Sequence, residues 1–193
     1  MMNNQFYAVL ARMKYISRWA LMRNTRAESV HEHSFDVALL AHALAELHNR
    51  RFGGQVNVEQ CVLQAMYHDA PEIFTGDMPT PVKYDNEDIR RAYRQVEQLS
   101  AEKLLGMLPD DLQEVYRPLL LPDETSEEAR IVKAADKISA LLKCVEELGQ
   151  GNREFASARR TLEAAIRGMK LPAADCFLEE FLPAFELTLD EQG

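Results

Sequence analysis

Apolar residues recur at helical spacing along most of the chain. Their period predicts a first helix over residues 3–15. Residues 30–50 are apolar on most faces, which predicts a central buried helix. A third helix is predicted to start at Asn57, with Gln60 as its capping-box partner, and to run towards residue 69. The amino-terminal third of the chain is therefore expected to be helical.

One segment interrupts this pattern. Pro71, Gly76, Pro79 and Pro81 cannot all lie inside one helix, because proline lacks the amide hydrogen that an interior turn needs. We therefore predict a turn-rich loop over residues 71–85.

Helical periodicity resumes after this loop. The pattern predicts five further helices, over residues 86–107, 110–120, 126–149, 153–168 and 173–187. Thr125 and Glu128 have the spacing of a capping box for the longest of them. Because no alternating strand pattern and no internal repeat occurs, the fold class is predicted to be all-α, in a single domain.

Charge is unevenly distributed along the chain. The 193 residues carry a formal net charge of −9, which argues against a nucleic-acid polymer or an anionic membrane as partner. Residues 1–27 contain no acidic residue but five basic ones: Arg12, Lys14, Arg18, Arg23 and Arg26. This segment fits either a site for a small anion or a solvated basic helix face, and charge alone does not separate the two.

Nothing in the sequence predicts export or a membrane span. The N-terminus lacks the basic flank and apolar run of a signal peptide, and no stretch is long and apolar enough to cross a bilayer. Cys61, Cys144 and Cys176 each fall in an apolar helical pattern and have no metal-like spacing. Three buried free thiols and a reducing cytoplasm are expected.

Four separated residues could form a metal site: His33, the adjacent pair His68 and Asp69, and Asp136. Two neutral imidazoles and two carboxylates suit a divalent ion of intermediate softness. Each residue also has an ordinary interpretation, because a histidine often hydrogen-bonds to a neighbouring carboxylate. Asp136 lies in a strongly apolar helix and needs a partner, which could be a metal or a neighbouring lysine. All five histidines occur by position 68, so a mononuclear site is the simpler expectation.

The segment around the His-Asp pair adds candidate chemistry. Glu72 could orient a water or exchange a proton with a leaving oxygen, or it could be a cap or surface charge. Asp77 could accept a hydrogen bond from a hydroxyl or stabilise a turn. Arg18 and Trp19 pair a guanidinium with the only tryptophan, which suits a phosphate beside a sugar-like group. The alternative is a core tryptophan beside a surface arginine. Together with the 67–83 segment, these residues indicate a metallophosphohydrolase.

These residues resemble a known family. The spaced set His33, His68-Asp69 and Asp136 is similar to the metal set of the HD-domain phosphohydrolases. The longer strings, residues 18–24, 32–34, 67–83 and 133–137, resemble the bacterial 5′-deoxynucleotidases of the YfbR type. The resemblance covers about residues 5–190.

The resemblance implies a fold, a reaction and a partner. It implies an α-helical HD domain over residues 1–193, with an N-terminal helix bearing Arg18 and Trp19, a core site within residues 30–140 and C-terminal helices within 150–190. The implied reaction is hydrolysis of deoxyribonucleoside 5′-monophosphates to deoxynucleosides and phosphate by a cytoplasmic homodimer. The implied cofactor is one divalent ion, with Co²⁺ favoured and Mn²⁺, Cu²⁺, Zn²⁺ or Mg²⁺ as alternatives.

The resemblance also implies residue roles. The metal ligands would be His33, His68, Asp69 and Asp136. Glu72 matches the catalytic acid or base, and Arg18 matches the residue that orients the phosphate. Trp19 matches the residue beside the sugar that disfavours a 2′-hydroxyl. The substrate-contacting residues would be Arg18, Trp19, His33, Asp69, Asp77, Met78, Pro79, Thr80 and Asp136.

Three other functions stay open at this point. The first is another HD phosphohydrolase acting on triphosphates or other phosphorylated nucleotides, although the chain shows no long basic cradle for a triphosphate. The second is a non-catalytic nucleotide or metal sensor of the same fold. The third is a two-iron HD-type oxygenase, which the lack of histidines after position 68 disfavours.

Overall fold

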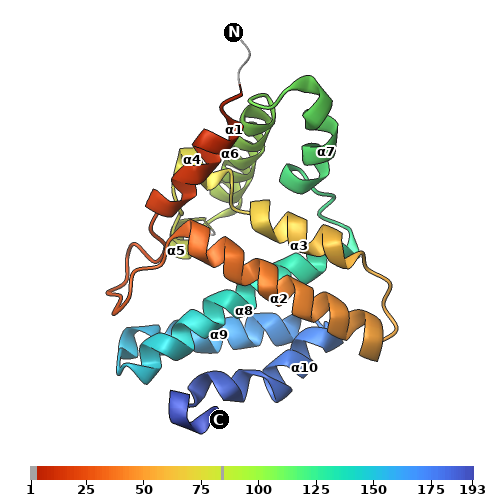
Figure 1. Ribbon diagram of the computed structural model, residues 1–193. Coiled ribbons are helices and arrows are strands. Elements are labelled where there is room, and N and C mark those ends of the chain that lie inside the picture. The colour runs from red at the N-terminus through yellow and green to blue at the C-terminus, as the bar shows by residue number, and fades with distance from the viewer. Residues whose placement is uncertain (1–3, 84) are drawn as a thin grey trace. The chain divides into compact units, whose positions relative to one another are not determined.

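The computed structural model describes residues 4–83 and 85–193, with the backbone alone described at Thr80. The described residues are helical and contain no strand beyond one isolated antiparallel bridge between Ser17 and Ser29 (Figure 1). The all-α fold class is therefore confirmed.

The helices follow one another with short connections, except for residues 16–29 between the second and third elements. They are α1 (Phe6–Leu10), η1 (Ala11–Tyr15), α2 (Val30–Arg51), α3 (Val58–Tyr67), α4 (Glu72–Thr75), α5 (Thr80–Lys83), α6 (Glu87–Leu105), α7 (Asp110–Leu120), α8 (Glu127–Gly149), η2 (Arg153–Phe155), α9 (Ala156–Gly168), α10 (Pro172–Glu180), η3 (Leu182–Glu186) and η4 (Leu189–Glu191). The long predicted helices agree with α2, α6, α7 and α8 to within two residues at each end. Asn57 caps α3 as predicted, since its side chain accepts the backbone N–H of Gln60 at 3.0 Å.

Several local predictions were wrong. The predicted loop 71–85 contains two short helices, α4 and α5, because proline is tolerated at a helix start. The cap of α8 is Ser126, not Thr125; its hydroxyl accepts the Ala129 N–H at 3.1 Å. The predicted helix 173–187 divides at Phe181, just before Pro183. Cys176 is only half-buried, whereas Cys61 and Cys144 are buried free thiols as expected.

The chain's contacts divide it into two compact units. The first unit contains Met1–Arg23, Ala27–Phe35 and Met66–Asp123. Its core is formed by Phe6, Met13, Val30, Ala70, Ala101, Leu104, Leu105, Leu108 and Leu120. Burying each large apolar side chain contributes about 1.5–3 kcal/mol, so this core is what holds the turns around residue 70 in place.

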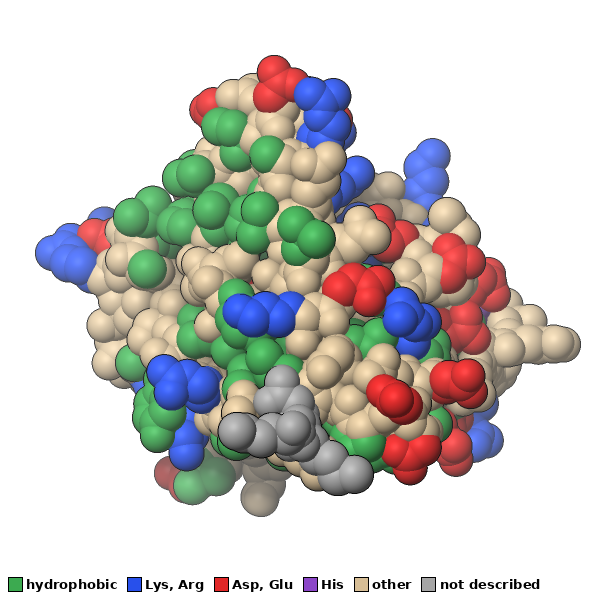
Figure 2. Space-filling view, turned by 90° about the horizontal axis from the view of Figure 1, so that it is seen from above, with side chains coloured by type: hydrophobic (Ala, Val, Ile, Leu, Met, Phe, Trp, Pro, Cys, Tyr) green, Lys and Arg blue, Asp and Glu red, His purple; other side chains and the backbone are tan. Residues whose placement is uncertain are grey.

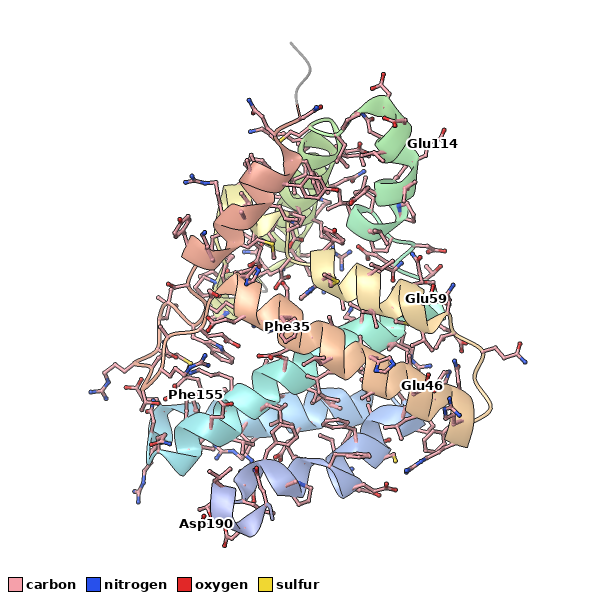
Figure 3. All side chains as sticks on the ribbon, viewed as in Figure 1. Phe35, Glu46, Glu59, Glu114, Phe155 and Asp190 are labelled. Carbon is pink, nitrogen blue, oxygen red and sulfur yellow. The ribbon has the colours of Figure 1, made fainter. Side chains whose placement is uncertain are left out.

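The second unit contains Asn24–Arg26, Asp36–Ala65 and Glu124–Gly193. In this unit α8 and α9 form an antiparallel pair, and Phe155 lies fully buried at the turn between them (Figures 1 and 3). Its core combines α2 residues such as Val37 and Leu44 with α8 residues such as Ile138 and Leu141. These four side chains are essentially inaccessible to solvent, as the predicted buried central helix requires.

The surface carries mixed charge. On the face seen in Figure 2, Lys and Arg side chains stand singly or in small groups among acidic and apolar ones. Of the five basic residues in the acid-free segment, Arg12, Lys14, Arg23 and Arg26 are exposed and only Arg18 is half-buried. Within the described ranges, no helix is both long and apolar enough to traverse a bilayer.

Candidate active site

The helix that carries His33 begins with a capping box. The Ser29 hydroxyl accepts the Glu32 N–H at 3.2 Å, and the Glu32 carboxylate accepts the Ser29 backbone N–H and hydroxyl, both at 2.8 Å. This arrangement satisfies amide groups at the start of α2 and fixes its first turn. His33, one residue later, is completely buried and is therefore held in one place.

The segment from Tyr67 to Gly76 keeps the chain tightly turned after α3. Backbone N–H groups of Ala70, Glu72 and Ile73 each donate to the carbonyl three residues earlier, at 3.0–3.2 Å. Residues three apart in such a turn lie on the same side, so Asp69 and Glu72 face together. Gly76 ends α4 with φ +72°, a left-handed conformation that favours glycine.

The side chains of His33, His68 and Asp69 converge. The two histidine rings have centroids 5.3 Å apart. Nε2 of His33 lies 3.5 Å from Oδ2 of Asp69, and Nε2 of His68 lies 3.2 Å from the same oxygen. Ligands that share one ion lie about 2.8–3.6 Å apart when each is about 2.0–2.2 Å from it and the angle between them is about 90–109°. The two measured distances to Asp69 lie in the range expected for ligands of one divalent ion.

The charge state of Asp69 suits a ligand. Burial by itself would raise the pKa of its carboxyl, but the His68 imidazole, then His33 and Arg18, outweigh this effect and lower the pKa well below its usual range. Asp69 is thus an anion, which is the form that binds a metal ion.

Glu72 has the opposite properties. It is 7% exposed, and its Oε2 has no hydrogen-bond partner among the described residues. Burial raises the pKa of Glu72 to about 10, and the nearby carboxylates of Asp69 and Asp77 raise it further against the opposing charges of Arg18 and Lys83. The group therefore holds a proton at neutral pH and can donate it.

Asp77 contacts the Trp19 backbone. Its Oδ2 accepts the Trp19 N–H at 3.2 Å. Burial raises the pKa of Asp77, whereas Arg18 and the Trp19 N–H act in the opposite direction. Asp77 thus joins the segment after α4 to the Arg18-Trp19 segment, and both of the open interpretations, hydroxyl acceptor and turn stabiliser, remain compatible with this contact.

Arg18 and Trp19 are both half-buried in the first unit, and a glutamate lies between them. Oε2 of Glu28 accepts the Trp19 indole N–H at 2.8 Å and lies 3.8 Å from Nε of Arg18. Glu28 is 7% exposed. The sequence reading missed this residue, although one signal was present: Glu28 is the first acidic residue after the acid-free segment 1–27.

The other predicted site residues are placed as follows. Met78 and Pro79 are half-buried, and the Pro79 carbonyl accepts the N–H groups of Val82 and Lys83, which starts α5. The Thr80 side chain lies outside the described part of the structure. Asp136 is half-buried on α8, in the second unit. The roles assigned to these residues stay predictions.

Comparison with solved structures defines the class. The chain superposes on an HD-domain phosphohydrolase of Listeria innocua with a TM-score of 0.79 and 26% identity, over 96% of this chain and 90% of that one. It also matches a cyanophage S-2L HD phosphohydrolase, solved with dA and one catalytic Zn²⁺, with a TM-score of 0.67 and 20% identity, over 94% and 96% of the two chains. The fold is that of the HD-domain phosphohydrolases.

Sequence comparison narrows the class to one family. The family model described as 5′-deoxynucleotidase YfbR-like matches residues 5–185, and the chain belongs to this family. It is 52% identical over 192 residues to a 5′-deoxynucleotidase of Vibrio vulnificus, covering 99% of both chains. It is 50% identical over 194 residues to the 5′-deoxynucleotidase YfbR of Escherichia coli O127:H6, covering 99% of this chain and 96% of that protein. The predicted resemblance is confirmed, and one family model spans both compact units.

Proposed function

We propose that this protein hydrolyses deoxyribonucleoside 5′-monophosphates to deoxynucleosides and phosphate, with one divalent metal ion as cofactor. One observation carries the proposal: two histidine nitrogens converge on the anionic Asp69, in a chain half-identical to proteins named 5′-deoxynucleotidases. The enzyme is then a metal-dependent phosphoric monoester hydrolase, in agreement with the function expected from the sequence.

His33, His68 and Asp69 would hold the metal, with Asp136 as the fourth ligand. The second carboxylate is included because Asp136 matches the metal set of the HD-domain phosphohydrolases that the sequence resembles. The bound ion supplies a Lewis acid that polarises a phosphoryl oxygen and lowers the pKa of water. Co²⁺ is the proposed ion, and Mn²⁺, Cu²⁺, Zn²⁺ and Mg²⁺ are the alternatives to compare.

The chain's own residues then bind, orient and transfer protons. The Arg18 guanidinium holds the phosphoryl group by charge-assisted hydrogen bonds. A water attacks phosphorus as the bond from phosphorus to the 5′-oxygen breaks, and the proton that this water loses goes to solvent. Glu72 keeps a proton at neutral pH and gives it to the departing 5′-oxygen, so the deoxynucleoside leaves as a neutral alcohol. After this step the Glu72 carboxylate recovers a proton from solvent.

Selection of the sugar is assigned to Trp19 and the segment after α4. The Trp19 ring packs against the sugar and leaves a 2′-hydroxyl without a hydrogen-bond partner, which costs about 1–3 kcal/mol. Asp77 accepts a substrate hydroxyl, Met78 and Pro79 line the same side, and Thr80 is assigned to the substrate from the family resemblance alone. The cyanophage protein, solved with dA and one Zn²⁺, supports the idea that this fold accepts a deoxynucleoside beside one metal.

A homodimer and a cytoplasmic location complete the proposal. A cavity of about 280 Å³ in the first unit is lined largely by apolar side chains, among them Tyr7, Met13 and Met66. Phe35, which also lines it, is 61% exposed on α2 (Figure 3). A second copy covering these side chains would remove apolar surface from water.

The function is tested by phosphate release from dAMP and AMP. Metal-stripped protein is resupplied with cobalt, manganese, copper, zinc or magnesium, and dADP and dATP are run alongside. The expected result is metal-dependent release from dAMP alone. Release mainly from the triphosphate would replace the substrate class, and binding without release under every metal would identify a sensor. Iron analysis of the purified protein tests the oxygenase alternative.

The ligand set is tested separately. Asp136→Asn and Asp69→Asn should each lower bound metal and activity together, whereas Glu128→Gln, a change on the same helix as Asp136, should change neither. Full metal content in Asp136→Asn would remove Asp136 from the ligand set and leave the reaction assignment standing.

A further inference from the structure

Glu28 contacts both Trp19, which is assigned to the sugar, and Arg18, which is assigned to the phosphate. A single oxygen, Oε2, accepts the Trp19 indole N–H at 2.8 Å and lies 3.8 Å from the Arg18 Nε. The carboxylate is almost fully buried. The Trp19 contact is a hydrogen bond, whereas the 3.8 Å contact to Arg18 is an ion pair without a hydrogen bond. The buried carboxylate therefore holds the indole directly and attracts the guanidinium by charge, which favours one separation between the two groups.

The backbone around Glu28 is also fixed. The Arg18 N–H donates to the Glu28 carbonyl, and the Val30 N–H donates to the Ile16 carbonyl, both at 2.9 Å. The Ser17–Ser29 bridge lies between these two bonds. This short antiparallel pairing holds Glu28 directly across from Arg18, so its side chain starts from a fixed point.

Trp19 is held in a strained conformation. Its φ is +60°, in the left-handed region, where a bulky side chain is an outlier. Left-handed backbone costs about 1–2 kcal/mol for a residue with a Cβ, and such strain persists only where surrounding contacts impose it. Three hydrogen bonds hold Trp19 in this conformation. Its backbone N–H donates to Asp77, its carbonyl accepts the Met22 N–H at 2.9 Å, and its indole N–H donates to Glu28.

We propose that Glu28 is a positioning residue that sets the selectivity between deoxyribonucleotides and ribonucleotides. It anchors the Trp19 indole and the Arg18 guanidinium to one carboxylate, so the sugar-facing ring stays at a fixed distance from the phosphate-binding group. Without this anchor the ring can move aside and admit a 2′-hydroxyl. The inference rests on the proposed function, which assigns phosphate to Arg18 and the sugar to Trp19.

The test compares Glu28→Ala with Glu28→Gln in the full-length, metal-loaded enzyme. Alanine removes both contacts, whereas the glutamine amide oxygen can still accept the indole N–H. For Glu28→Ala we expect the ratio of kcat/KM for dAMP to that for AMP to fall on the order of tenfold, since a hydrogen bond to a charged group is lost. Glu28→Gln should keep most of the ratio and raise KM for both nucleotides, because the negative charge of Glu28 beside Arg18 is lost.

A second readout needs no activity. Trp19 is the only tryptophan, so intrinsic fluorescence reports on this ring alone. In substrate-free protein, Glu28→Ala should shift Trp19 emission to longer wavelength and increase its quenching by iodide, and Glu28→Gln should resemble the wild type. The matched control is Glu102→Gln, which alters a surface ion pair with Arg117 in the same unit and should change neither readout.

The outcomes separate the two proposals. An unchanged dAMP-to-AMP ratio together with unchanged Trp19 emission in folded Glu28→Ala would overturn the positioning role. If Glu28→Ala does not fold, KM values for dAMP and AMP in Glu28→Gln that equal those of Glu102→Gln also overturn it. If the wild type releases no phosphate from any 5′-monophosphate, the proposed function fails, while the fluorescence series still decides whether Glu28 holds Trp19.

Discussion

Glu72 and Glu147 are both buried, but their pKa values are shifted in opposite directions. Glu72, in the first unit, leaves a buried oxygen without a partner among the described residues, and its pKa is raised to about 10. Glu147, in the second unit, is fully buried on α8, yet its pKa is lowered to about 2. The difference between them lies in the neighbours, not in the burial.

The neighbours of Glu147 satisfy both of its oxygens. Lys143 donates to Oε1 at 2.6 Å, Asn152 donates to Oε2 at 2.8 Å, and the Thr25 N–H donates to both oxygens. Burial alone would raise its pKa, but these donors outweigh that effect. Lys143 also donates to the Arg26 carbonyl at 2.7 Å. Glu147 is therefore a structural anion, whereas Glu72, which lacks such donors among the described residues, is the proposed proton donor.

The largest expected effect is on catalysis at Glu72. Glu72→Gln should lower kcat by about 10²–10⁴-fold, because general acid catalysis is lost, and should leave metal content intact. Phosphate release and metal analysis on the same preparation check this prediction. Equal loss of metal and activity would show that Glu72 acts through the metal site instead.

Although Glu72→Gln should lower activity, it should raise the stability of the metal-free protein above neutral pH. In metal-free wild type, the raised pKa of Glu72 contributes stability below its ordinary value of 4.5, and this contribution is lost as pH rises towards 10. Glutamine needs no proton, so metal-free Glu72→Gln should gain stability relative to wild type above neutral pH. Urea denaturation at pH 5 and pH 8 measures this difference.

The next largest effect is on folding at Glu147. Glu147→Ala should lower the free energy of unfolding by about 3–5 kcal/mol, because it leaves the buried Lys143 ammonium without its carboxylate. Denaturation of the variant, with Glu146→Ala at the exposed neighbouring position as control, gives the value. A loss below about 1 kcal/mol would mean that the donors around Glu147 find other partners.

The smallest expected effect is the loss of stability that protonation of Glu147 causes at acid pH. Because the pKa of Glu147 is depressed, its stabilisation is present above pH 4.5 and is lost as pH falls towards about 2. Wild type should therefore lose stability more steeply across this window than Glu147→Gln does. Thermal melts at half-unit steps of pH compare the two slopes, and parallel curves would remove Glu147 from the acid response.

The sequence predicted the long helices because the spacing of apolar residues, the positions of the prolines and the capping residues all indicate the same helix boundaries. It failed where local and tertiary effects compete: proline at a helix start produced α4 and α5 within the predicted loop, and Ser126 outcompeted Thr125 as a cap. The resemblance identified His33, His68 and Asp69, which the structure brings together. Glu28 was missed because its role comes from the Ser17–Ser29 pairing, which no periodicity in the sequence reveals.

The Ser17–Ser29 pairing also bears on where the chain tolerates insertion. It closes a surface loop whose two halves are anchored separately, by the Trp19–Met22 turn on one side and by the Thr25 contact to Glu147 on the other. Between these anchors Arg23 is exposed. Doubling a loop's length costs only about 0.6 kcal/mol of closure entropy. An insertion after Arg23 would leave the Met22 to Trp19 and Thr25 to Glu147 hydrogen bonds in place.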